Sequence, residues 1–176
     1  MERRIDTEIT VPVQWEAGAA VLRRDAESIV VDDQVEGTVR LTALVGGTEL
    51  TRHAQVDVGP GFAMDGQTVT IPLRWEATEH TRRFPTVTGV LILGARSEHP
   101  SLSTLAIDAE HVPPLGVLGT IGDAAGGLDL ARRACLALLE RISARLVAAV
   151  AADAAAATDV ASFSNLGPAP RRIDLD

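Results

Sequence analysis

Residues 113–150 read PPLGVLGTIGDAAGGLDLARRACLALLERISARLVAAV, and this stretch decides the fold. From Leu128 onward its apolar residues recur with the period of a helix and form one stripe, while the charged residues lie largely opposite. The stripe comprises Leu128, Ala131, Cys135, Leu138, Leu139, Ile142 and Leu146. Nearly everything before this stretch has the pattern of short strands. A long helix that follows a run of strands needs a sheet to bury its stripe, so we expect an α+β domain in which a curved antiparallel sheet grips one C-terminal helix.

The residues before the helix predict about six to seven strands. The clearest is 67–77, where Val69, Ile71, Leu73 and Trp75 share one face and polar residues share the other. Pro72 belongs to the polar set and predicts an edge or a bulge, because proline cannot donate a ladder hydrogen bond. We expect strands at residues 5–13, 28–31, 37–44, 48–58, 67–77, 85–95 and 102–112.

Three further predictions follow from local patterns in the sequence. The pair Gly46–Gly47 between two alternating runs predicts a hairpin, since such turns need positive φ. Residues 85–95 are apolar on both faces, so we expect them in the centre of the sheet. Residues 15–25 predict a short helix or turn, because Gly18 disfavours a long helix. We divide the chain into a domain at 1–150 and an Ala-rich helix extension with a flexible tail at 151–176.

Composition excludes several classes of function. The net charge of −8 over 176 residues argues against nucleic-acid binding, which needs a basic surface. The chain has no Lys, which excludes Schiff-base chemistry and a phosphate-loop lysine. This Arg- and Ala-rich usage is typical of GC-rich genomes such as those of actinobacteria. No run of 18 apolar residues and no apolar leader is present, so we expect neither membrane insertion nor secretion. A single cysteine fits a reducing cytoplasm, where we expect the protein to be located.

Motifs that carry chemistry are weak in this chain. The glycines at 116, 119, 122, 126 and 127 resemble a phosphate loop only in spacing, and we interpret them as a tight connection. The histidines (His53, His80, His99 and His111) lack metal-ligand spacing, so we expect no metal and no cofactor. Cys135 lies on the apolar stripe and is interpreted as a core residue rather than a nucleophile.

The last strand and the helix carry a family resemblance. The stretch LAIDAEHVPPLGVLGTIGDAAGGLDLARRACLALLERI (105–142) resembles the C-terminal part of the SRPBCC or START-like superfamily, whose fold is called helix-grip or Bet v 1-like. TIPLRWEATEHTRRFPTVTGVLIL (70–93) resembles the preceding strand pair in uncharacterised actinobacterial members. The resemblance covers roughly residues 3–150 in topology. It implies a pocket between helix and sheet that holds small hydrophobic molecules, and it carries over no catalytic residue.

We therefore expect a non-enzymatic protein that binds a small hydrophobic ligand in this cavity. Two alternatives stay open, namely an enzyme of the polyketide cyclase/aromatase type and a protein-interaction module with a collapsed pocket. Homo-oligomerisation through the sheet edge near Pro72 or through the Ala-rich end also stays open. The expected ligand contacts are the large apolar residues of the strands and helix, with one histidine as polar anchor and one arginine as carboxylate partner: Phe62, Trp75, Phe84, Leu139, His111 and Arg74.

Overall fold

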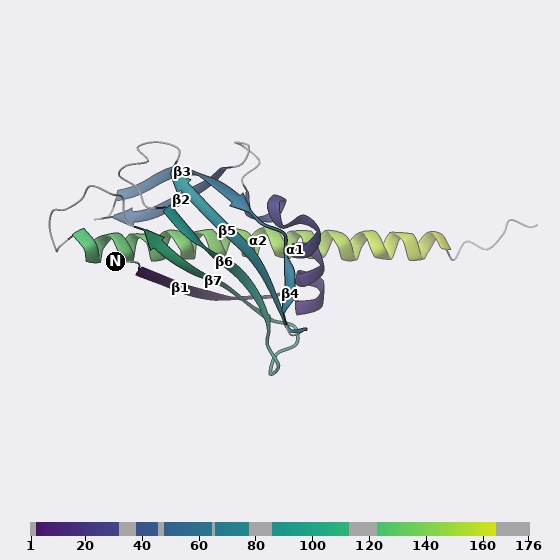
Figure 1. Cartoon of the computed structure of the whole chain (residues 1–176). Helices are drawn as coiled ribbons and strands as arrows, with labels where there is room; N and C mark the ends of the chain where they lie inside the picture. The colour runs from purple at the N-terminus through teal and green to yellow at the C-terminus, as the bar shows by residue number, and fades with distance from the viewer. Residues whose placement is uncertain are drawn as a thin grey trace, which may run out of the picture.

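A computed structural model describes residues 3–31, 38–45, 48–64, 66–77, 86–112 and 123–164 of the chain. Seven strands form one antiparallel sheet that curves around a long C-terminal helix (Figure 1). The α+β fold class with six to seven strands is therefore confirmed. The elements in chain order are β1 (Arg3–Val11), α1 (Trp15–Val30), β2 (Thr38–Val45), β3 (Thr48–Val58), β4 (Phe62–Met64), β5 (Thr68–Ala77), β6 (Thr86–Ala95), β7 (Ser103–Val112) and α2 (Asp123–Ser164).

The strands lie in the order β1-β7-β6-β5-β3-β2, and β4 pairs with β5 beyond the end of β3. β6 lies between β7 and β5, as its two apolar faces predict. β2 and β3 form the predicted hairpin, whose turn at 46–47 lies outside the described residues. The N–H of Gly59 donates to the Pro72 carbonyl over 2.8 Å, in the gap between β3 and β4. Pro72 thus lies at a local edge of β5, where no strand needs the N–H that proline lacks.

The long helix α2 lies across the hollow of the sheet. It contacts β1 at one edge of the sheet and β2 at the other edge. The predicted stripe is buried at Cys135, Leu138, Leu139, Ile142 and Leu146. The helix continues through residue 150, and residues 151–158 are all exposed where α2 extends past α1 (Figure 1). The division at residue 150 stays a prediction.

The first helix differs from its prediction in length. α1 has 16 residues, and at Asp25 its backbone leaves the helical region (φ −132°, ψ 33°), so that two helical stretches meet at a kink. Gly18 does not end the helix. Its lack of a side chain lets α1 approach β6, because a Cβ there would lie 3.0 Å from the Leu93 side chain.

The strand predicted at 28–31 is wrong. Ser28, Ile29 and Val30 form the last turn of α1, and Ile29 and Val30 are buried in the core. A run of four residues is too short to show whether its apolar positions follow the helix period or the strand period. Such a run is therefore compatible with a strand and with the end of a helix. The guanidinium of Arg145 on α2 donates to the carbonyl oxygens of Ser28 and Val31, which joins this helix end to α2.

The length and apolarity of the helices bear on membrane insertion. None of the helices in the described ranges combines the length and the apolarity that crossing a bilayer requires, although α2 has 42 residues.

Candidate functional site

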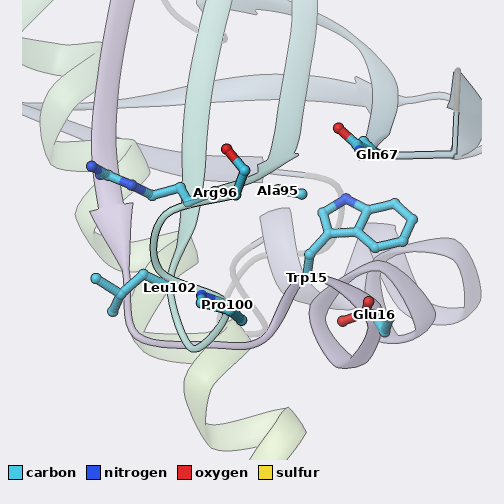
Figure 2. A pocket seen from close by; sticks show the side chains of 8 residues that line it. Trp15, Glu16, Gln67, Ala95, Arg96, Pro100 and Leu102 are labelled. Atoms are coloured by element: carbon cyan, nitrogen blue, oxygen red, sulfur yellow. The ribbon is translucent and has the colours of Figure 1, made fainter.

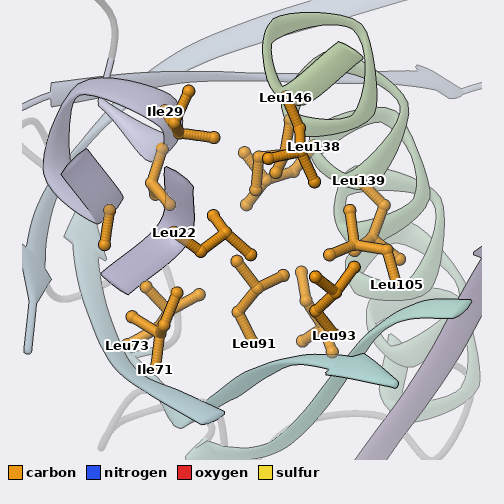
Figure 3. Close-up of a cluster of buried hydrophobic side chains, with 14 of the residues drawn as sticks. Leu22, Ile29, Ile71, Leu73, Leu91, Leu93, Leu105, Leu138, Leu139 and Leu146 are labelled. Atoms are coloured by element: carbon orange, nitrogen blue, oxygen red, sulfur yellow. The ribbon is translucent and has the colours of Figure 1, made fainter. Parts of the chain in front are cut away.

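The interior beside α1 is filled by large aliphatic side chains. α1, α2 and the sheet all contribute to this cluster, and the side chains converge from the three elements in Figure 3. Its labelled members are Leu22, Ile29, Ile71, Leu73, Leu91, Leu93, Leu105, Leu138, Leu139 and Leu146, and nearly all of them are inaccessible to solvent. This half of the interior is a packed core.

The inner face of the sheet changes character toward the other end, where β1 begins and α2 starts (Figure 1). In the register, Ile71 pairs with Leu91, whereas two residues further on Leu73 pairs with Gly89 and then Trp75 pairs with Val87. The described side chains that are buried at this end are mostly smaller than leucine, apart from Trp75 and from Ile5 on β1, which pairs with Ala109. We call this region, together with Cys135 on α2, the Trp75 end: Ile5, Ala54, Val56, Trp75, Val87, Ala109 and Cys135.

Two of the expected ligand contacts lie on the opposite face of the sheet. Arg74 is exposed and forms an ion pair with Glu76, because both belong to the polar set of β5. Phe62 is 47% exposed on β4 and pairs with Thr70, which also belongs to the polar set. Neither side chain faces α2, so neither lines a cavity between sheet and helix.

Of the other four expected contacts, two are buried in the interior and two lie partly or wholly outside the described residues. Trp75 and Leu139 are buried in the interior. The backbone of His111 pairs with Val87 on β6 and with Arg3 on β1, while its side chain lies outside the described part. Phe84 falls outside the described residues altogether. The structure thus brings Trp75 and the backbone of His111 to the same end of the sheet.

The feature that identifies the architecture is that α2 contacts both edge strands, β1 and β2, while the sheet of β7, β6 and β5 between them curves around it (Figure 1). The chain has the helix-grip fold. This is the architecture implied by the resemblance of residues 70–93 and 105–142. The kink at Asp25 gives the helix-grip domain two short helical stretches after β1.

Comparisons with solved structures find proteins that are similar at low sequence identity. A protein of Thermus thermophilus is similar with a TM-score of 0.48 at 13% identity, over 84% of this chain and 99% of its own. An Arabidopsis thaliana member of the major latex protein family gives 0.44 at 9% identity, over 84% and 95%. An aromatase/cyclase of Streptomyces gives 0.35 at 21% identity, over 88% and 94%. These likenesses concern overall shape, and we draw nothing about function from them. No protein-family model and no curated protein matches the sequence.

A small pocket at the α1 end of the helix-grip domain was missed by sequence reasoning. It lies where the end of β6, the following turn and the start of α1 meet (Figure 2). Its volume of about 140 Å³ is below the usual range of sites for drug-sized ligands. The guanidinium of Arg96 donates to the Thr10 hydroxyl over 2.7 Å. The lining residues are Trp15, Glu16, Gln67, Ala95, Arg96, Ser97, Pro100 and Leu102.

We expect the thiol of Cys135 to be unreactive in the folded protein. Burial raises the pKa of its thiol to about 12, because the apolar surroundings disfavour the thiolate. The thiolate is the species that attacks disulfide reagents. We expect 5,5′-dithiobis(2-nitrobenzoate) at pH 8 to react with native protein at least about a hundredfold more slowly than with urea-unfolded protein. The absorbance of the released thionitrobenzoate follows both reactions. A native rate close to the unfolded rate would contradict the burial of this thiol.

Proposed function

We propose that this helix-grip domain binds a small hydrophobic ligand at the Trp75 end, between the sheet and the N-terminal half of α2. One observation carries the proposal, namely that the inner face of β5, β6 and β7 changes from leucines and isoleucines to glycine, alanine and valine around Trp75, with Ile5 on the neighbouring β1. Small side chains leave room that large ones occupy, and an indole offers a broad apolar surface for contact. The described interior therefore supports binding through apolar contact.

Three of the expected contacts, namely Trp75, Leu139 and His111, have a place in this proposal. Trp75 forms the sheet side of the site, and Leu139 marks where the packed core begins on α2. His111 occupies the register position across from Val87, and we propose this residue as the polar anchor of the ligand. Buried polar groups give orientation to an otherwise apolar site.

Tryptophan fluorescence tests the proposal directly. The chain has two tryptophans and no tyrosine, so in a Trp15→Phe variant the indole emission comes from Trp75 alone. We expect 1-anilinonaphthalene-8-sulfonate, a fluorescent probe with apolar aromatic rings and one sulfonate, to bind this variant and to quench Trp75 by energy transfer. Cys135→Leu introduced into this variant fills the Trp75 end from α2, so we expect the affinity for the probe to fall about tenfold, equivalent to about 1.4 kcal/mol.

Matched variants separate this site from others. Ala144→Leu adds a similar volume at an exposed position of the same helix, and we expect it to leave the affinity unchanged. Ala131→Leu, half-buried one turn before Cys135, gives a second filling if Cys135→Leu unfolds the protein. Urea denaturation reports the stability of each variant. Equal probe binding by filled and unfilled proteins, or no quenching of Trp75, would refute a ligand site at this end.

A further inference from the structure

The outer face of the sheet, which points away from α2, carries exposed apolar side chains. Phe62 and Met64 are 47% and 53% exposed on β4. The register continues this surface across the sheet, because Phe62 pairs with Thr70 and Thr70 pairs with Ile92. The resulting apolar strip runs over β4, β5 and β6 and comprises Phe62, Met64, Pro72, Val90 and Ile92, of which the last three are half-buried.

A second strip on the same face is acidic. It lies on β7 and β1 and comprises Asp6, Glu8, Asp108 and Glu110. In the register Val90 pairs with Asp108, and Asp108 pairs with Asp6. Adjacent strands are about 4.8 Å apart, so the apolar and acidic strips lie within about 10 Å of each other.

One guanidinium on this face is already engaged. Arg4 donates two hydrogen bonds to the Asp108 carboxylate, at 2.7 and 2.8 Å, and this hydrogen bonding lowers the pKa of Asp108. Arg74 at the other side of the apolar strip forms its ion pair with Glu76. The guanidinium of Arg96 also lies beside this strip, because it donates to the hydroxyl of Thr10, two residues beyond Glu8 on β1. The acidic strip keeps a net negative charge, with two arginines beside four carboxylates.

We propose that the outer face of the sheet docks a basic amphipathic helix of another protein. An α-helix is about 10–12 Å wide with its side chains, which matches the spacing of the two strips. Its apolar stripe would cover Phe62, Met64 and Ile92, while lysines or arginines beside that stripe reach the carboxylates of β7 and β1. A second copy of this chain would bring its own acidic strip into the interface, where like charges oppose association.

A defined probe tests this docking surface in the full-length protein. The probe is a fluorescein-labelled synthetic helix of lysine and leucine, followed by fluorescence anisotropy, with a glutamate–leucine helix as its charge-reversed counterpart. We expect the lysine–leucine helix to bind, with an affinity that falls as salt screens the acidic strip. Phe62→Ser with Met64→Ser should weaken binding at least about tenfold. Asp6→Asn with Glu8→Gln should weaken binding about fivefold and reduce the salt dependence.

The control is Leu136→Ser, which changes an exposed apolar residue of similar exposure on α2 and should leave the affinity unchanged. The proposal fails if the control weakens binding as much as the Phe62/Met64 variant. It also fails if the glutamate–leucine helix binds equally well. A dimer in sedimentation velocity that is lost in the Phe62/Met64 variant would assign the strip to a second copy and overturn the proposal. None of these outcomes depends on a ligand at the Trp75 end.

Discussion

Replacing Leu139 with alanine is expected to lower the free energy of unfolding by about 3 kcal/mol, because truncating a fully buried leucine removes apolar contacts and leaves a cavity. The Leu139 side chain is inaccessible to solvent and lies in the cluster shared by α1, α2 and the sheet (Figure 3). The cluster contains side chains from elements that are far apart in the chain. These packed elements cannot easily move together to fill the space left by the missing atoms. Equilibrium unfolding in urea measures the change.

Leu136 provides the matched control for this experiment. It lies three residues before Leu139 on the same helix and is 38% exposed. Leu136→Ala keeps the helix propensity nearly constant and removes a side chain that is already partly in contact with water, so we expect a loss of only about 1 kcal/mol. Equal losses at the two positions would show that α2 does not present the Leu139 face to the sheet.

A methyl group added at Gly89 is the second substitution with a large expected effect. A Cβ at this position would lie 2.4 Å from both the Ala109 Cβ and the Asp108 carbonyl oxygen on β7. Backbone atoms cannot move aside as a flexible side chain can, so β6 and β7 would have to separate. We expect Gly89→Ala to destabilise the protein by about 2–3 kcal/mol, the usual cost of overpacking.

Gly94 on the same strand makes the test specific. A Cβ there meets no atom within 4 Å, and no positive φ is present at this position. Gly94→Ala should therefore leave stability unchanged or raise it by up to about 1 kcal/mol, because alanine restricts the unfolded chain. Thermal or urea unfolding of both variants gives the comparison, and a destabilised Gly94→Ala with an unaffected Gly89→Ala would contradict the close approach of β6 to β7.

Part of the candidate site could be predicted from the sequence. The alternation on β5 places Trp75 with Val69, Ile71 and Leu73, and all four are buried as that pattern predicts. The same alternation puts Arg74 on the opposite face of β5, where it is exposed. The expectation that Arg74 enters the cavity did not take this alternation into account. Phe62 gave no such signal, because a three-residue strand has no period to assign its face. The side-chain positions of Phe84 and His111 stay predictions.

By itself, the sequence determined the properties that depend on near neighbours along the chain. These are the buried stripe of α2, the two faces of β5, and the β2–β3 hairpin, because helix and strand periods and tight turns are local. Only the tertiary structure decided the helical state of residues 28–30, the approach of Gly18 to β6, and the outward position of Phe62. Each of these depends on contacts with residues distant in sequence. The pairing of β1 with β7 is of the same kind, since it joins strands about a hundred residues apart, and it closes the sheet around α2.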